Sequence, residues 1–274
     1  MMGTYTVTGG GGCQLHVEEV GNPDGRPILF IHGFSQCRLS WSRQVHSDLA
    51  DDFRLVAIDN RGHGLSDKPR DAYGDSKLWA DDIQAIITTL ALDRPILSGW
   101  SYGAVIICDY VRIYGEDRIS GINLVAAISK LGTERALSVI TPEFLALAPG
   151  FFSNDAMESV GALEALLRMV FYEAPTPADF YAMLGFNAIV PPYVRQALLS
   201  RSLENDDLLP QLRKPVLITH GQDDSCVLPA AAEQHATAIP HARLSLYPRV
   251  GHAPFWEDAD RFNRELRELV ASQS

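Results

Sequence analysis

The pattern of apolar and polar positions changes along the chain, and it predicts the structural elements. Residues 4–8 and 14–20 alternate polar with apolar side chains, which predicts two antiparallel strands joined through the glycines at 9–12. After Pro27, short continuous apolar runs replace this alternation. They occupy residues 28–31, 55–58, 96–97, 122–127 and 216–219, and a further strand is expected at 244–247. Continuous runs of this length are typical of strands buried on both faces of a parallel sheet.

Helices with one apolar face lie between these runs. In residues 77–92, Leu78, Ile83 and Leu90 recur at helical spacing, and residues 258–272 show the same periodicity. Strands and helices therefore alternate. This alternation predicts an α/β protein with a mostly parallel, doubly wound sheet and right-handed crossovers.

The alternation stops between residues 130 and 212. Helix-like segments follow one another there, with proline-rich joints and no convincing strand. They cover residues 134–147, 155–172, 177–189 and 192–203. A run of helices inserted between two sheet strands predicts a helical cap over the active edge of the sheet. We therefore expect a core domain made of residues 1–129 and 213–274, and a cap made of residues 130–212.

Composition and charge narrow the classes of partner. The chain has 274 residues, of which 46% are hydrophobic and 21% are charged, as in ordinary globular domains. The formal net charge of -11 argues against nucleic acid and anionic membrane surfaces, because both repel an acidic protein at long range. No apolar stretch approaches the length of a membrane span, so we expect no membrane partner.

Cysteine usage bears on the compartment. Cys13, Cys37, Cys108 and Cys226 are widely spaced and form no C-x-x-C pair, which is typical of reduced thiols. The first residues lack a basic region followed by an apolar run, so we expect no secretory signal. These features predict a cytoplasmic protein.

The stretch Gly99-Trp100-Ser101-Tyr102-Gly103 joins a short apolar strand to a helix and has the pattern Gly-x-Ser-x-Gly. A serine at the tip of such a turn, a nucleophile elbow, has a strained backbone and projects its oxygen above the sheet edge. The flanking residues must be small, because the turn brings strand and helix close together. The amide of Tyr102 falls at the helix N-terminus, where it can meet developing negative charge. Ser101 is therefore a candidate nucleophile, provided that the chain supplies a base, an acid and a second amide.

Further motifs occur in the order in which the α/β-hydrolase superfamily has them, and the sequence resembles this superfamily over essentially its whole length. His32-Gly33-Phe34 follows the first parallel strand, and the stretch from Asp59 to Asp67 is similar to a structural loop of the family. The resemblance implies an α/β-hydrolase fold, with an oxyanion hole formed by the amides of Phe34 and Tyr102. Trp41 matches a position that is often aromatic in this branch. We expect Trp41 and Trp100 to contact the substrate.

The resemblance also implies a base and an acid. His252, in Val250-Gly251-His252-Ala253-Pro254, follows a strand and precedes the last helix, which is the place of the base. The family places its acid third after a glycine, and in His220-Gly221-Gln222-Asp223-Asp224 that position is Asp224, with Asp223 as the alternative. Ser101, Asp224 and His252 then form a catalytic triad in the family's chain order.

The chemistry requires all three groups. A serine hydroxyl is a poor nucleophile until a base accepts its proton, and the carboxylate holds the imidazole in the tautomer that can do so. The remaining histidines show no spacing typical of metal ligands, and His63 and His220 are interpreted as structural loop residues. Neither a cofactor nor a metal is implied.

The serine at position 101 distinguishes this chain from related enzymes that use another nucleophile. The cap and the His-Gly-Phe turn also resemble epoxide hydrolases and haloalkane dehalogenases, but those enzymes use a carboxylate nucleophile. The best match is to small bacterial carboxylesterases and cofactor-free haloperoxidases (perhydrolases). This match implies a serine hydrolase that cleaves carboxylic esters of small to medium apolar substrates through an acyl-enzyme on Ser101.

Two kinds of alternative stay open. A carbon–carbon bond hydrolase or a perhydrolase would use the same triad, although carbon–carbon hydrolases typically have an aromatic residue where this chain has Ala253. In a different class, a small-molecule receptor or a hydroxynitrile-lyase-like protein would share the fold. The expected partner is a small-molecule substrate, and a homo-oligomer is left open.

Overall fold

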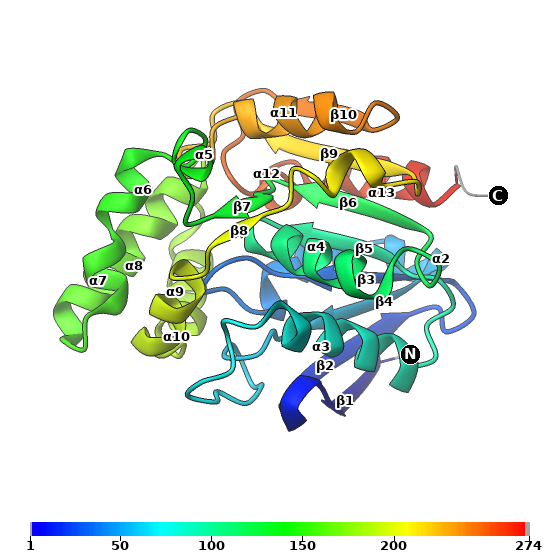
Figure 1. The fold of residues 1–274 in the computed structure, drawn as a ribbon, viewed down its shortest axis with the longest axis horizontal. Helices are drawn as coiled ribbons and strands as arrows, with labels where there is room; N and C mark the ends of the chain where they lie inside the picture. Colours follow the sequence, from blue (N-terminus) through cyan, green and yellow to red (C-terminus); the bar gives the residue numbers. More distant parts are fainter. Residues whose placement is uncertain (1, 272–274) are drawn as a thin grey trace.

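A twisted sheet of eight strands forms the centre of the computed structural model, which describes residues 2–271 (Figure 1). The strand order is β1-β2-β4-β3-β5-β6-β9-β10. These strands are β1 (Met2–Thr8), β2 (Gln14–Gly21), β3 (Arg26–Ile31), β4 (Phe53–Ile58), β5 (Ile96–Trp100), β6 (Gly121–Val125), β9 (Val216–Gly221) and β10 (Arg243–Tyr247). β2 pairs antiparallel with β1 and with β4, and all other neighbouring pairs are parallel. The predicted hairpin and mostly parallel sheet are confirmed.

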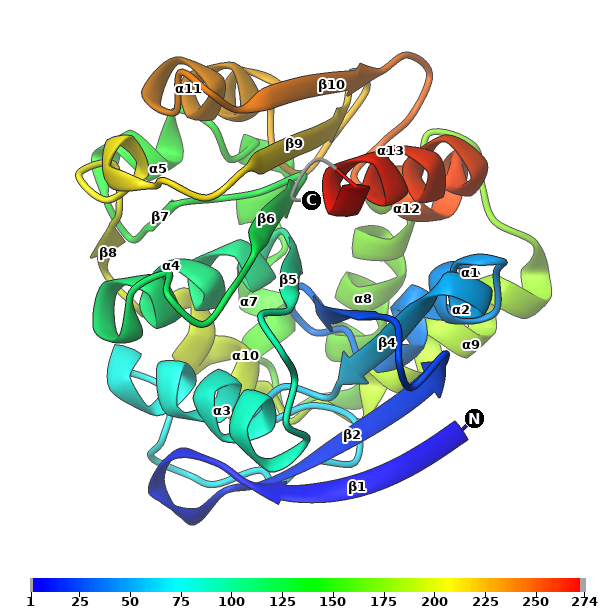
Figure 2. The ribbon, with the colours of Figure 1, turned by 90° about the vertical axis from the view of Figure 1, so that its right-hand side faces the viewer.

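Helices cover both faces of this sheet, as a doubly wound topology requires (Figure 2). One face carries α3 (Ser76–Thr89), α4 (Tyr102–Tyr114) and α11 (Ala230–Ala238). The other carries α1 (Ser42–Val45), α2 (Leu49–Asp52), α12 (Pro254–Glu257) and α13 (Ala259–Ala271). The described residues also form short 3-10 turns: η1 (Gly10–Gly12), η2 (Arg38–Trp41) and η3 (Leu209–Gln211).

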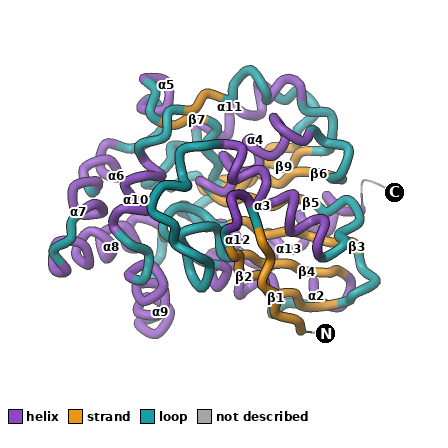
Figure 3. Tube along the Cα trace, turned by 60° about the horizontal axis from the view of Figure 1, so that its bottom comes forward, coloured by secondary structure: helices purple, strands orange, loops and turns teal. Residues whose placement is uncertain are grey.

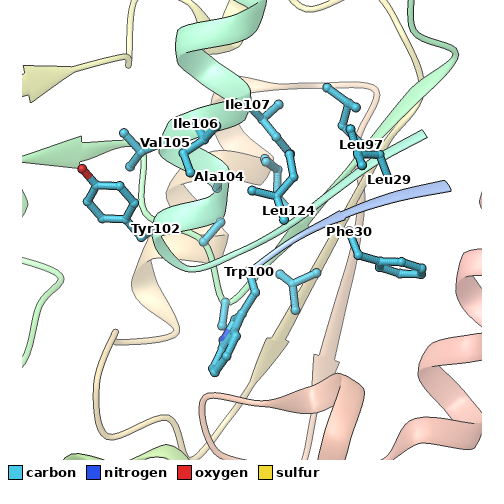
Figure 4. Close-up of a cluster of buried hydrophobic side chains, with 14 of the residues drawn as sticks. Leu29, Phe30, Leu97, Trp100, Tyr102, Ala104, Val105, Ile106, Ile107 and Leu124 are labelled. Carbon is cyan, nitrogen blue, oxygen red and sulfur yellow. The ribbon is translucent and has the colours of Figure 1, made fainter. Parts of the chain in front are cut away.

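The burial of the strands follows their sequence patterns. Side chains of β2 alternate between buried and partly exposed, whereas every residue of β5 and β6 is buried. Figure 4 shows Ile107 of α4 directed toward Leu97 of β5 and Leu124 of β6, with Leu29 of β3 close by. The central strands are therefore sealed between two helical layers, which fixes their carboxyl ends as a rigid platform for a site.

The inserted helices gather at one end of the sheet (Figures 1 and 3). They are α5 (Glu134–Leu137), α6 (Pro142–Ala146), α7 (Ala148–Phe152), α8 (Ala156–Val170), α9 (Pro177–Ala188) and α10 (Pro192–Leu199). The proline-rich joints are helix starts: Pro142 and Pro177 each follow a threonine whose side chain caps the helix. Buried Arg195 of α10 ties these helices together, because its guanidinium donates to Phe151 O and Ser159 Oγ, both at 2.8 Å.

The structure corrects two expectations about this insertion. The segment 134–147 is two short helices, α5 and α6, because residues near Ile140 pair with Val227 instead of continuing the first helix. The insertion also contains strands: β7 (Lys130–Leu131) pairs antiparallel with β8 (Leu203–Glu204). Strands of two residues are too short to leave a readable pattern in the sequence. In the described part of the chain, every helix is too short or too polar to span a bilayer.

Candidate active site

The turn between β5 and α4 holds Ser101 in a strained backbone conformation. Ser101 has φ 53° and ψ -111°, a region that residues other than glycine rarely adopt. Its N–H donates to Val125 O at 2.8 Å and so ties the turn to the end of β6. A Cβ atom at Gly103 would collide with the carbonyl oxygen of Ile31, so α4 can approach β3 only because this residue is glycine. The predicted elbow geometry is present.

Two backbone segments meet beside Ser101. Tyr102 is the first residue of α4, so its N–H has no acceptor within the helix. On the other side, a Cβ at Gly33 would lie 3.3 Å from Ser101 Cβ, which places the turn after β3 against the elbow. Phe34 and Tyr102 both line the cavity that contains Ser101. The structure therefore brings together the two residues whose amides are predicted to form the oxyanion hole.

Buried His32 holds the turn that carries Phe34. His32 Nδ1 lies 2.9 Å from Gly33 O, and the backbone N–H of Asn60 donates to His32 Nε2 at 3.0 Å. Burial lowers the pKa of His32 to about 4, so the ring is neutral at neutral pH and Nε2 is free to accept. Sequence reasoning missed this role of His32, since a histidine before a glycine carries no signal of what its ring contacts.

The loops after β9 and β10 bring the predicted acid and base together. His252 Nδ1 lies 2.6 Å from Asp224 Oδ2, and both side chains are buried. Asp224 Oδ1 accepts from the N–H groups of Cys226 at 2.8 Å and Val227 at 2.9 Å. Burial alone would raise the pKa of Asp224, but the charges and hydrogen bonds of His252 and His220 hold it well below its usual value. The acid is therefore ionised and can orient the imidazole.

Asp223, the alternative acid, points elsewhere. Its Oδ2 accepts the N–H of Arg249 at 2.9 Å, and the residue is exposed. It thus closes the loop after β10 instead of contacting His252. The geometry favours Asp224 as the partner of the histidine.

The histidine loop is also fixed by hydrogen bonds that the sequence did not predict. The indole N–H of Trp100 donates to His252 O at 2.8 Å, and the N–H of His252 donates to Val170 O at 2.7 Å. Glu257 accepts from Gly251 N–H at 2.8 Å and from Tyr172 N–H at 2.7 Å. Because Val170 and Tyr172 lie at the end of α8, these bonds connect the candidate base directly to the inserted helices.

Ser101 and His252 line one apolar cavity of about 40 Å³ beneath those helices. Its apolar wall includes Ile128, Leu131, Ile140, Phe144, Leu166 and Leu199. No lysine, arginine, aspartate or glutamate is among its described lining residues.

The two tryptophans predicted to contact the substrate differ. Trp100 lines the cavity, and its ring lies 5.7 Å from the ring of His252, centroid to centroid. Trp41 does not: it is fully buried and packs on Phe30 and Phe255 at centroid distances of 4.9 Å and 4.3 Å. The expectation for Trp41 is therefore corrected. An aromatic residue near a site in sequence serves core packing equally well, and the sequence does not distinguish the two.

One set of side chains in the described chain has the spacing of a metal site. Ligand atoms of Asp224, Cys226 and His252 lie within 4.8 Å of one another. However, the close hydrogen bond between Asp224 and His252 already occupies two of these groups, and a metal ion would have to break it. Burial and the charge of Asp224 also raise the pKa of the Cys226 thiol well above its usual value, which opposes thiolate formation. We assign no metal to this site.

Comparisons with known proteins bear on the fold and on the class of activity. A family model described as "alpha/beta hydrolase fold" matches residues 26–259. The crystal structure of an esterase from Rhodococcus sp. ECU1013 is similar over 99% of both chains, with 35% identity and a TM-score of 0.94. Among curated proteins, a bifunctional esterase/perhydrolase of Acinetobacter calcoaceticus is 27% identical over 97% of this chain and 99% of its own length. A non-heme haloperoxidase of Rhodococcus erythropolis is 26% identical over the same shares of the two chains.

Proposed function

The chain belongs to the α/β-hydrolase fold family and is a hydrolase, and we propose that it cleaves carboxylic esters of small, uncharged apolar compounds through an acyl-enzyme on Ser101. One observation carries the proposal. The strained Ser101 lines a single apolar cavity together with His252, whose ring is hydrogen-bonded to Asp224. The names of the similar esterases support the ester as the substrate class.

The reaction proceeds in two halves. Ser101 Oγ attacks the ester carbonyl while His252 Nε2 accepts its proton, and Asp224 stabilises the imidazolium that forms. The amides of Phe34 and Tyr102 bind the oxyanion of the tetrahedral intermediate. The alkoxide leaves with the proton from His252. Water, activated by the same imidazole, then attacks the acyl-enzyme and releases the acid.

The cavity wall supports the proposed substrate class. Apart from Ser101 and His252, polar side-chain atoms in the described lining come from Gln36, Trp100, Tyr102 and Cys226, and none of these residues supplies a cation for a carboxylate. A charged acyl or alcohol group would lose its hydration there without a partner. We therefore propose neutral esters, and we propose that residues 130–212 act as the lid of a core formed by residues 1–129 and 213–274.

The four cysteines bear on the compartment. All four are free and buried, as expected in a reducing environment. We propose the cytoplasm as the site of action.

Hydrolysis of p-nitrophenyl esters, from acetyl to long acyl chains, tests the proposed function. We expect turnover by the wild type and loss of about three orders of magnitude or more in Ser101→Ala and His252→Ala, with circular dichroism confirming that both variants are folded. A p-nitrophenyl phosphonate should label the wild type stoichiometrically and leave Ser101→Ala unlabelled. Retention of more than about a tenth of the activity in Ser101→Ala would overturn the assignment. Labelling without ester turnover would point to the receptor alternative.

A perhydrolase is the second candidate, favoured by the names of two similar proteins. Here hydrogen peroxide replaces water as the acceptor of the acyl group, and the product is a peracid. Peracid formation from acetate esters and hydrogen peroxide, measured against ester hydrolysis by the same preparation, distinguishes the two outcomes. Loss of both activities in Ser101→Ala would place them on one acyl-enzyme.

A further inference from the structure

A second imidazole contacts the acid of the candidate triad. His220, near the end of β9, is fully buried, and its Nε2 lies 3.0 Å from Asp224 Oδ2. The same oxygen accepts the Nδ1–H of His252 at 2.6 Å. The same carboxylate oxygen thus lies close to two histidine rings, one from strand β9 and one from the loop after β10.

The surroundings of His220 fix which nitrogen carries its proton. Nε2 lies 2.9 Å from Val227 O as well as 3.0 Å from Asp224 Oδ2, so it faces two acceptors. A lone pair on Nε2 would be repelled by both oxygens, whereas an N–H at Nε2 is attracted by both. His220 Nδ1 is buried, and it makes no hydrogen bond to another described residue. His220 therefore carries its proton on Nε2, which donates to Val227 O and lies 3.0 Å from Asp224 Oδ2.

We propose that His220 is a positioning residue for the reaction: it donates to Asp224 Oδ2 and thereby sets how strongly this carboxylate holds the protonated His252. The proposal rests on the proposed function of Ser101, His252 and Asp224. It assigns a specific task to a histidine that the sequence alone indicates only as a loop residue.

The negative charge of the Asp224 carboxylate is shared among the groups that contact it. Two backbone N–H groups bind Oδ1 of the buried carboxylate, His252 Nδ1 lies 2.6 Å from Oδ2, and His220 Nε2 lies 3.0 Å from the same oxygen. Each donor stabilises the ionised form, and each draws negative charge away from the others. Without His220, Oδ2 would be a stronger base toward His252, and the carboxylate would be free to rotate about its χ2 angle. His220 therefore limits both the basicity and the orientation of Asp224.

Other titratable groups near the pair make different contacts. Asp223 and Cys226 lie in the same loop as Asp224, whereas Glu257 and His235 belong to other elements. Lys130 and Asp206 lie beyond His235. Glu257 and Asp223 bind backbone N–H groups. His235 Nε2 lies 3.1 Å from Ser129 Oγ. Among the described residues, the side chains with a nitrogen within 3.0 Å of Asp224 Oδ2 are those of His252 and His220. A change at His220 is therefore separable from changes at its neighbours.

Three variants test the proposal. His220→Leu removes the donor at similar bulk. His220→Gln keeps an amide N–H close to the place of Nε2. His235→Leu is the matched control, because it removes a buried histidine near His220 that does not contact Asp224. The measurement is the dependence of kcat and kcat/KM on pH with p-nitrophenyl butyrate, together with thermal unfolding of each variant.

In His220→Leu we expect kcat to fall by about tenfold or more while KM changes little, because orientation of the acid matters most when His252 becomes charged. The acid limb of the kcat/KM profile should move to higher pH by about half a unit or more, since a more basic carboxylate holds the imidazolium proton longer. His220→Gln should restore both values to nearly those of the wild type. His235→Leu should leave the acid limb in place.

A purely structural role would give a different result. It would lower the unfolding temperature and the fraction of active enzyme, as counted by phosphonate labelling, and leave the pH limb and the kcat per labelled site unchanged. That result in His220→Leu, or an equal shift in His235→Leu, would overturn the proposal. If His220→Leu does not fold, the low-field proton resonance of the His252–Asp224 hydrogen bond is measured in His220→Gln. An unchanged resonance supports hydrogen-bond donation as the role of His220. An altered resonance means that the shape of the imidazole ring matters instead, and it overturns the proposal. A wild type that is neither labelled nor active would instead refute the proposed function.

Discussion

The indole of Trp100 donates a 2.8 Å hydrogen bond to the backbone carbonyl of His252, and so joins the residue before the candidate nucleophile to the candidate base. The bond crosses from the end of β5 to the loop after β10, two segments separated by more than half of the chain. It fixes the distance between the elbow and the histidine loop with a buried donor and a buried acceptor. The hydrogen bond from Trp100 therefore helps to set the position of the His252 imidazole relative to Ser101.

We therefore expect Trp100→Phe to lower kcat by about tenfold, because it keeps a ring in place but releases the histidine loop. Its free energy of unfolding should fall by about 1–3 kcal/mol, the cost of leaving a buried carbonyl without its donor. Trp256→Phe is the matched control: Trp256 is half-buried and packs under Arg43. Steady-state kinetics and urea unfolding measure both effects. Equal kinetic losses in the two variants would contradict the assigned role of the indole.

The neighbouring acids Asp223 and Asp224 provide a test within one loop. Asp224→Asn should lower kcat by about three orders of magnitude or more, because the amide no longer holds His252 in the productive tautomer. Asp223→Asn should change kcat by less than about threefold, since its contact is with the backbone N–H of Arg249 at the surface. Assays on the same ester at one pH compare the two variants. The reverse order of effects would move the acid to Asp223.

The sequence predicted the sheet and the turn at Ser101 because both leave local signals, whereas His252 and Asp224 were candidates through the family resemblance. Continuous apolar runs identify buried strands, and the small residues around Ser101 follow from the close approach of α4 and β3. Residues whose task depends on a distant partner could not be found in this way. His220 contacts Asp224 through a ring whose direction no local pattern encodes, and Val170 supplies only a backbone oxygen to His252. Trp41 was misjudged for the same reason, since its partners lie on other segments.

The cavity wall makes a prediction about substrate size. Phe144 of α6 lines the cavity, with its ring 6.1 Å from that of Phe34, centroid to centroid. Phe144→Ala should open space for longer acyl groups and raise the ratio of kcat/KM for octanoyl to acetyl esters by about tenfold or more. Phe152→Ala, a truncation in the next helix outside the described lining of the cavity, should leave this ratio unchanged. An unchanged ratio in Phe144→Ala would place the acyl group elsewhere.

Three buried histidines predict how stability depends on pH. Burial lowers the pKa of His32 and His235 to about 4 and that of His63 to about 3. In the unfolded chain a histidine titrates near pH 6.5, so between about pH 6.5 and 4 the unfolded state binds more protons and stability falls as pH falls. Each of the three lowers the free energy of unfolding by up to about 1.4 kcal/mol per pH unit in this window.

His63→Asn, which keeps a donor for Arg61 O, should reduce the slope of the unfolding free energy against pH, measured by urea unfolding between pH 7 and pH 5. His46→Asn, at an exposed position, should leave this slope unchanged. Equal slopes in the wild type and His63→Asn would mean that His63 has the same pKa in the folded and unfolded states, which would contradict the effect of its burial.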